Sequence, residues 1–312
     1  MKKNRIFIIA LCACILLAGC SEPHHNGNLT MEDIMLTEIN DPLCAPGGDY
    51  NTGKTTSVTI TKSKETTAKK MKDVKRSTEF IDDYTQKYYY NTLTDTQKDY
   101  YRYCFNKKRY LINGPDPNYS SKDKDIAYYA FQRENPHLQL YPTQYQIDNG
   151  LTSMTPKKRN KILNAAKVIA DKASEYDRTF AKIKVIHDEL RDLIKYESYK
   201  EMETAFLEGK ADCSGYADAF CLVCQLAGID CIVVWGTANN RTINEDHAWN
   251  MVKIGDDWYN VDVCWDDVRL YTHTYFLRTD KAFSSNHTVK MPISCPKATK
   301  RYTVDQYGNE AA

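Results

Sequence analysis

Apolar residues recur at helical spacing through the middle of the chain and predict a pair of amphipathic helices. Thr155 followed by Pro156 supplies an N-cap and a proline at the first helical position, so the first helix is expected to run from there to about Lys172. The second is expected to end near Ile194, and its apolar face comprises Phe180, Ile183, Ile186, Leu190 and Leu193.

Shorter helices are expected before this pair, where ordered structure should begin near Thr78. Helical spacing joins Phe80, Ile81, Tyr84 and Tyr88. Thr94-Asp95-Thr96-Gln97 has the form of a capping box that opens another helix. A helix over residues 122–134 should end at Asn135, because the residue before a proline disfavours helical geometry. The many tyrosines here fit half-buried packing better than carbohydrate stacking.

The last third of the chain changes to the pattern of a helix followed by strands. The helix covers residues 213–227 and should end at Gly228 with a left-handed cap. A strand is expected over 232–236, and a hairpin over 247–254 and 257–264, joined at Gly255-Asp256 by a type II′ turn. Helices followed by an antiparallel sheet predict an α+β fold.

The N-terminus has the pattern of a secretory signal. Basic residues precede an apolar run over residues 6–17, which is too short to span a membrane. The following Leu17-Ala18-Gly19-Cys20 looks like a bacterial lipobox, which implies removal of residues 1–19, a lipid on Cys20 and a location in the cell envelope, outside the cytoplasm. An ordinary signal peptide with an incidental cysteine is the alternative.

Residues 20–77 are poor in large apolar side chains, which predicts a flexible tether. Because this segment is basic, it could also bind anionic lipid headgroups. We expect a helical N-terminal region over 78–150, a catalytic domain over 151–295 and a tail over 296–312. The net charge of +1 and mean hydropathy of −0.60 favour neither a nucleic-acid partner nor a further membrane span.

Cysteine usage does not point to a disulfide scaffold or a metal centre. The spacing of the cysteines beyond Cys20 favours no particular pairing. Cys221 and Cys224 form a CxxC pair, which within an apolar helix is interpreted as two buried hydrophobes rather than a redox or metal site. No metal or organic cofactor is expected.

Three residues in separate segments supply the groups needed for acyl transfer through a thioester. Cys213 would be the nucleophile, His247 the base and Asp262 the carboxylate that orients the base. Cys213 begins its predicted helix, where unpaired N–H groups favour a thiolate, although Asp212 opposes this slightly. The N–H of Cys213 could also stabilise an oxyanion.

The hairpin register tests this grouping. With a two-residue turn at 255–256, position 249 faces 262 and position 247 faces 264. Strand alternation then places His247 and Asp262 on one face as diagonal neighbours. A slip of one residue would separate them.

Four further residues are candidates for substrate binding. Ser214 and Gly215 would leave room for a substrate backbone, and Trp249 and Trp265 could line an acyl tunnel or simply pack in the core. His187 is interpreted as a structural helix residue. Tyr199 is a candidate side-chain oxyanion donor only through its place before Cys213, and packing is the favoured interpretation.

The segments around these residues resemble the transglutaminase-like superfamily of papain-type folds, as a bacterial extracytoplasmic lipoprotein member. The matching stretches are residues 209–217, 247–250, 258–262 and 265–267, with accompanying similarity at 186–190, 275–277 and His287. The resemblance implies that Cys213, His247 and Asp262 form the catalytic triad. The sequence departs from the family at Cys264, where Thr is usual, and at Ser214, where Gln is frequent.

A lipid-anchored cysteine peptidase or amidase acting on protein or cell-wall peptide is the favoured function. A protein-glutamine transamidase would need an amine that outcompetes water. A non-catalytic scaffolding lipoprotein that uses an inactive transglutaminase-like domain is the alternative from another class.

Overall fold

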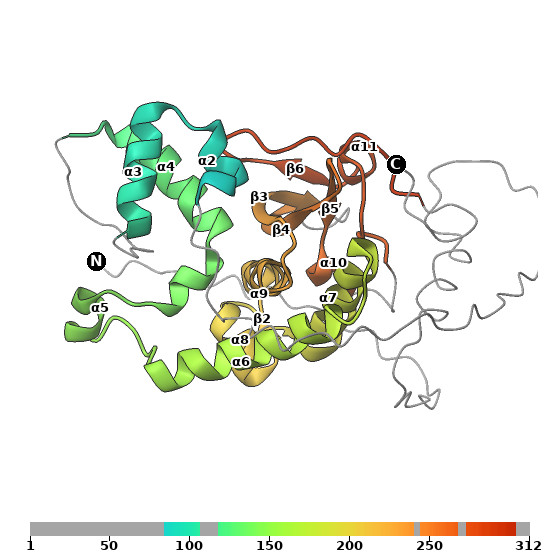
Figure 1. Ribbon diagram of the computed structural model, residues 1–312, viewed down its shortest axis with the longest axis horizontal. Helices are drawn as coiled ribbons and strands as arrows, with labels where there is room; N and C mark the ends of the chain where they lie inside the picture. The colour runs from blue at the N-terminus through green and yellow to red at the C-terminus, as the bar shows by residue number, and fades with distance from the viewer. Residues whose placement is uncertain (1–83, 107–117, 240–243, 268–272, 304–312) are drawn as a thin grey trace, which may run out of the picture. The chain divides into compact units, whose positions relative to one another are not determined.

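The chain folds around one buried helix, α9 (Cys213–Leu226), which lies between an antiparallel sheet and a group of helices (Figure 1). Each residue from Gly215 to Cys224 is buried, as expected of a helix that is apolar on all sides. The computed structural model describes residues 84–106, 118–239, 244–267 and 273–303, which all belong to one compact unit, residues 40–312.

The sheet has four strands in the order β5-β4-β3-β6, all antiparallel. The strands are β3 (Cys231–Asn239), β4 (Asn244–Ile254), β5 (Asp257–Val261) and β6 (His287–Val289). Ile254 pairs with Asp257 across the turn, and Gly255 has a φ of +58° while Asp256 does not have a positive φ, which fits the predicted type II′ turn. The predicted α+β fold is confirmed.

The opposite side of α9 is covered by helices α6, α7 and α8, which are Pro156–Ala173, Thr179–Leu193 and Met202–Glu208. Helix α6 begins as predicted, because the Thr155 side chain accepts a hydrogen bond from the N–H of Lys158. A short parallel pair, β1 (Lys195–Tyr196) and β2 (Lys210–Ala211), leads the chain into α9. Gly228, with a φ of +74°, ends α9 as expected.

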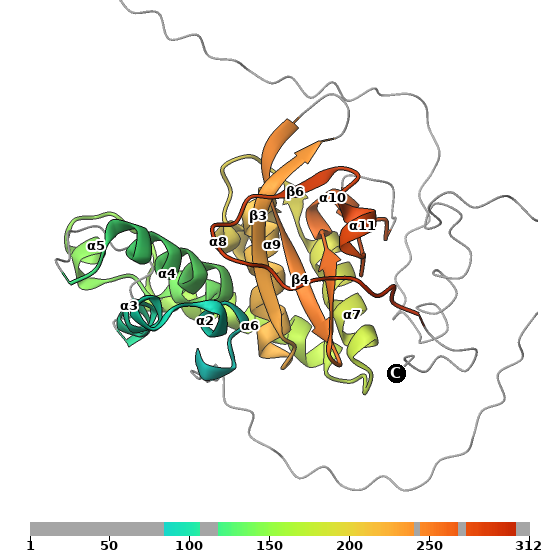
Figure 2. The ribbon, with the colours of Figure 1, turned by 90° about the horizontal axis from the view of Figure 1, so that it is seen from above.

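The N-terminal helices gather on the β3 side of the sheet (Figure 2). They are η2 (Tyr84–Gln86), α2 (Tyr88–Thr92), α3 (Asp95–Asn106), α4 (Ser121–Glu134), η3 (Pro136–Leu140) and α5 (Gln144–Asp148). The predicted capping box is present, since Thr94 and Gln97 each bond the other's backbone N–H. The continuous helix expected through Tyr84 and Tyr88 is wrong, because Lys87 is extended and caps a new helix.

The tyrosines of this region pack inside it, in agreement with the packing interpretation. Tyr89 and Tyr101 are completely buried, and the Tyr89 hydroxyl donates to the Val233 carbonyl of β3 over 3.2 Å. The Glu134 carboxylate accepts from the N–H groups of Tyr89 and Tyr90 and from the Tyr101 hydroxyl. This buried carboxylate therefore fixes α2 and α3 to the end of α4.

We expect Tyr101→Phe to lower the free energy of unfolding by about 2 kcal/mol. The hydroxyl donates to Glu134 over 2.6 Å and accepts from Asn135 over 2.7 Å, so its loss removes one hydrogen bond from each of two buried groups. Burial raises the pKa of Glu134 to about 7, and the Tyr101 hydrogen bond opposes this rise because it favours the ionised form. The loss of stability should therefore increase as the pH rises through about 7.

Urea denaturation at about pH 5 and about pH 8 measures this dependence. Tyr84→Phe is the matched control, since Tyr84 lies in the same helical region and is only half-buried. An equal loss for Tyr101→Phe at both pH values would contradict the role given to the Tyr101–Glu134 bond.

The predicted strand over 257–264 ends earlier than expected. Strand β5 stops at Val261, and residues 263–267 form the short helix α10 (Val263–Asp267). The ladder therefore ends at the pair Asn250–Val261, and the expected pairing of 247 with 264 is wrong. The reason is that Asp262 caps α10, with its Oδ1 atom 3.1 Å from the N–H of Trp265.

Gly236 lets β6 approach β3. A Cβ atom at this position would lie 2.0 Å from the Thr288 carbonyl oxygen and 2.7 Å from the Trp249 ring. We expect Gly236→Ala to cost about 3 kcal/mol of stability, because backbone atoms of β6 cannot move aside without breaking the pairing. Thermal unfolding against Thr237→Ala on the same strand tests this, and a change no greater than that of the control would refute it.

Within the part of the chain that the structure describes, no helix has the length and apolar character needed to cross a membrane. The signal segment, Cys20, the tether, the predicted start near Thr78, Phe80, Ile81 and most of the C-terminal tail lie outside the described residues. The same part has a last short helix, α11 (Asp280–Phe283), before β6.

Candidate active site

Cys213 is the first residue of α9, as predicted. Asp212 forms the N-cap, and its Oδ1 atom accepts from the N–H of Gly215 over 3.1 Å. Strand β2 leads directly into this cap, and the N–H of Asp212 donates to the Lys200 carbonyl over 2.7 Å. Cys213 is half-buried, so its thiol is fixed at a helix N-terminus and remains partly accessible.

His247 and Asp262 are brought into direct contact. His247 lies on β4, and its Nε2 atom is 2.8 Å from Asp262 Oδ2, with both residues 1% exposed. Asp262 is also held by its backbone N–H, which donates to the Tyr275 carbonyl. The register of β4 and β5 places the two residues on one face of the sheet. The N-cap of α10 then holds the Asp262 carboxylate beside the His247 ring.

The imidazole of His247 joins the carboxylate to the thiol. Because Nε2 bonds Asp262, Nδ1 is the nitrogen left to interact with Cys213. Burial disfavours the imidazolium, but the charge and hydrogen bond of Asp262, together with Cys213, outweigh it and raise the pKa of His247 to about 10. Burial also opposes ionisation of Asp262, yet the charge and hydrogen bond of His247 hold its pKa well below the usual range.

His287 is a site residue to which the sequence pattern assigns no chemical role. It lies on β6, and its Nε2 atom is 3.0 Å from the same Asp262 Oδ2 atom that His247 contacts. The only signal for it in the sequence is its place among the accompanying elements of the resemblance. Two histidines from different strands therefore share one carboxylate oxygen.

The two predicted tryptophans pack against the His247 ring. The ring centroids of Trp265 and Trp249 lie 5.4 Å and 6.3 Å from that of His247. Both are buried, and the Trp249 Nε1–H donates to Asn260 Oδ1 over 3.1 Å. They exclude water from the base, and their contact with a substrate stays a prediction.

The remaining sequence candidates are placed less favourably. A Cβ atom on Gly215 would lie 2.8 Å from both the Lys200 carbonyl oxygen and the Ala211 side chain, so Gly215 serves helix packing rather than leaving room for a substrate. Ser214 is half-buried beside Cys213. The Tyr199 side chain is 95% exposed and its backbone has a φ of +62°, so the structure supports neither the oxyanion role nor the favoured packing interpretation.

A second buried network of hydrogen bonds joins α7 to α10. His187 is fully buried on α7, with Nδ1 3.0 Å from Asp188 Oδ1 and Nε2 3.1 Å from Asp266 Oδ2. Burial disfavours the charged ring, but the hydrogen bonds to these carboxylates outweigh it and raise the pKa of His187. Asp266 also accepts from the N–H of Tyr275, so the network supports the segment that holds Asp262. This agrees with the structural interpretation of His187.

Two groups of described residues have donor atoms close enough to hold a metal ion. In the group of His187, Asp188 and His273, the Lys184 ammonium already lies 2.7 Å from Asp188 and 3.1 Å from His273, which disfavours a metal cation. In the group of His247, Asp262 and His287, both imidazoles use Asp262 Oδ2 as their partner. Hydrogen bonds therefore account for both groups.

The described cysteines are free thiols, and the CxxC pair is completely buried. The Cys221 thiol donates to the Cys231 carbonyl over 3.3 Å. This placement fits the interpretation of Cys221 and Cys224 as buried hydrophobes. Cys44 lies outside the described residues.

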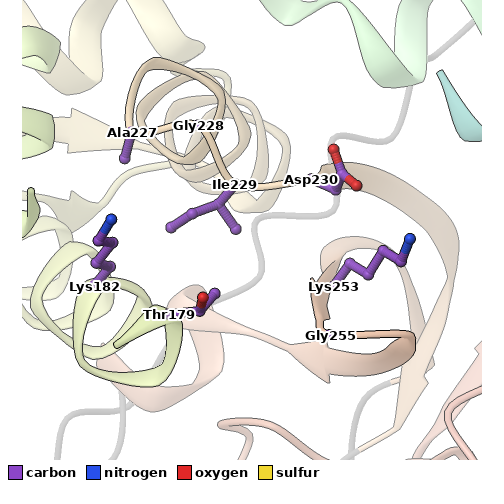
Figure 3. A pocket seen from close by; sticks show the side chains of 8 residues that line it. All are labelled: Thr179, Lys182, Ala227, Gly228, Ile229, Asp230, Lys253 and Gly255. Atoms are coloured by element: carbon purple, nitrogen blue, oxygen red, sulfur yellow. The ribbon is translucent and has the colours of Figure 1, made fainter. Parts of the chain in front are cut away.

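A pocket of about 180 Å³ lies at the other end of α9, lined by residues that include Thr179, Lys182, Asp230 and Lys253 (Figure 3). Helix α9 has 14 residues, so its two ends are about 20 Å apart. The pocket is therefore separate from Cys213 and takes no part in the arrangement described above.

Comparison with known proteins gives matches to part of the chain. The family model of the transglutaminase-like superfamily matches residues 165–263. Human kyphoscoliosis peptidase is 33% identical over 96 residues, which is 25% of this chain and 14% of that protein. The chain therefore spans only a small part of the length of this curated relative.

Solved structures give weaker matches. The periplasmic domain of TgpA from Pseudomonas aeruginosa has 18% identity and a TM-score of 0.29, with 37% of this chain and 49% of that chain covered. The crystal structure of a TGase has 16% identity and a TM-score of 0.31, with 44% and 40% covered. The segment that the model of the transglutaminase-like superfamily matches, residues 165–263, includes Cys213, His247 and Asp262.

Proposed function

We propose that the chain is a cysteine-dependent acyl-transfer enzyme that hydrolyses peptide or carboxamide bonds. The observation that carries the proposal is the position of His247, which is bonded to Asp262 over 2.8 Å and whose pKa is raised in part by the Cys213 thiol at the start of α9. A nucleophile, a base and an orienting carboxylate are the groups that thioester chemistry needs. The name of the human relative, a peptidase, favours hydrolysis.

In the proposed reaction, His247 Nδ1 takes the proton of the Cys213 thiol. The thiolate then attacks the substrate carbonyl, forming a C–S bond while the carbonyl electrons move to oxygen. Collapse of this intermediate breaks the C–N bond, and His247 gives its proton to the departing amine, which leaves a thioester. Water, deprotonated by His247, attacks the thioester and releases the acid and Cys213. The N–H of Cys213 is positioned to stabilise the oxyanion.

The location and the domain boundaries stay proposals that rest on sequence. The lipobox-like segment ending at Cys20 supports cleavage after residue 19, a lipid anchor and a position outside the cytoplasm. A tether over 20–77 would then connect the lipid to the folded part, and a peptide or protein near the membrane would be the substrate.

Alkylation by iodoacetamide tests the proposed nucleophile. Cys213 and Cys295 are both half-buried, and burial raises the pKa of Cys295, which makes it the internal reference thiol. We expect Cys213 to react roughly 10-fold faster or more at neutral pH, as read by peptide mass spectrometry, with no such labelling in Cys213→Ala. Equal rates for the two thiols would favour the non-catalytic scaffolding alternative.

A second experiment distinguishes hydrolysis from transamidation. The protein is incubated with a peptide library that contains glutamine and asparagine, with and without a primary amine, and cleavage, ammonia release and amine incorporation are measured. We expect products that carry oxygen from water in both conditions. Incorporation of the amine in place of water would instead identify a transamidase. If neither product forms, the result contradicts enzyme function on such substrates.

A further inference from the structure

His287 occupies a place at Asp262 that corresponds to the place of His247. Its Nε2 atom is 3.0 Å from Asp262 Oδ2, compared with 2.8 Å for His247, and the centroids of the two imidazole rings are 5.5 Å apart. The other carboxylate oxygen, Oδ1, accepts from the N–H of Trp265. Asp262 is thus held by donors from β4, β6 and α10.

The His287 ring is enclosed by aromatic side chains. It is 4% exposed, and its centroid lies 4.0 Å from Phe283, 4.7 Å from Trp265, 5.2 Å from Trp249 and 5.3 Å from Tyr275. Neither the substrate nor the thiol can use a ring in this position as a base. Its chemical contact with the site is through Asp262.

The partners of His287 determine which of its ring nitrogens donates to Asp262. Burial lowers the pKa of His287, and the positive charge of His247 lowers it further, whereas the pKa of His247 is raised. On its other side, the Nδ1 atom of His287 lies 2.8 Å from Asn286 Oδ1, so both ring nitrogens face oxygen atoms. Because an ionised carboxylate only accepts, the Nε2 atom of His287 must carry the proton and donate to Asp262.

We infer that His287 is a positioning residue of the proposed triad, an Nε2–H donor that fixes Asp262 Oδ2 and keeps the carboxylate an acceptor for His247. A carboxylate that already accepts from His287 is less able to take the proton of His247, so His247 keeps it for the leaving group. The inference rests on the proposed function, and it assigns a role to β6, which joins the sheet only because Gly236 leaves room for it.

The comparison of His287→Gln with His287→Phe tests this role. The Gln amide can place an N–H near the position of Nε2, whereas Phe fills the aromatic enclosure without a donor. We expect His287→Gln to retain most of the Cys213 alkylation rate, and His287→Phe to lose roughly 10- to 100-fold. Thermal unfolding of both variants shows whether the loss of alkylation rate follows a loss of stability instead. Thr288→Val, at an exposed position on the same strand, is the control for this comparison.

A measurement without turnover separates this inference from the proposed function. In a Cys213→Ala background, the low-field proton resonance of the His247–Asp262 hydrogen bond is recorded by NMR for each His287 variant. We expect the resonance to persist with Gln and to shift or disappear with Phe. An unchanged resonance in His287→Phe, or equal alkylation rates in the two variants, would overturn the inference, while slow alkylation of Cys213 in the unaltered chain would count against the function alone.

Discussion

We expect His247→Ala to reduce turnover by about 10⁴-fold or more and to lower the alkylation rate of Cys213 to that of Cys295. The imidazole is the group that takes the thiol proton, and its raised pKa of about 10 in this site makes the ring a strong acceptor for that proton. Without it, the N-terminus of α9 is the remaining influence that favours negative charge on sulfur.

The matched control for His247→Ala is the double variant with Cys213→Ala. Residues that act as a unit are not additive, so the double variant should be no less active than Cys213→Ala alone. Added imidazole should restore part of the alkylation rate of His247→Ala. A fully active His247→Ala variant would show that the chain uses another base.

Asp262→Asn should lower turnover by about 10³- to 10⁴-fold with little change in the fold. The amide has nearly the shape of the carboxylate, but its N–H₂ group donates to His247 Nε2, which forces the ring proton onto Nδ1. This is the nitrogen that must accept the proton of Cys213. Because the charge of Asp262 also raises the pKa of His247, that pKa should fall in the variant.

The pH dependence of turnover measures this change, because the departing amine takes its proton from His247. His247 has a raised pKa, so its protonated form persists until the pH rises through about 10. In Asp262→Asn this upper limit should move to lower pH. Asp256→Asn, in the exposed turn after β4, is the matched control and should leave the profile unchanged. An unaltered profile in Asp262→Asn would exclude Asp262 as the orienting group.

Local features were predictable where the signal lies within a few residues. The Thr94–Gln97 capping box, the Thr155 cap and the turn at Gly255 are all found in the structure, since each depends on hydrogen bonds or backbone angles of neighbouring residues. The register that follows from the Gly255 turn also placed His247 and Asp262 on one face.

Other features depended on contacts between distant segments. The strand pattern of residues 257–264 concealed the helix that begins after Asp262, although an aspartate before a helical turn is an N-cap signal. His287 is 25 residues from Asp262, and nothing in its local sequence indicates that it bonds the same carboxylate. Gly215, expected to leave room for a substrate, instead lies against the Lys200 carbonyl.

The sequence by itself determined the order of helices and strands and the three segments that hold Cys213, His247 and Asp262, because spacing and turn residues act locally. Only the tertiary structure decided which side chains share a carboxylate, how deeply they are buried and therefore in which direction the pKa of each imidazole moves. These properties depend on the pairing of β3 with both β4 and β6 and on the loss of water around Asp262 and the two histidines. The residues next to each of these side chains in the sequence do not encode the strand pairing or the burial.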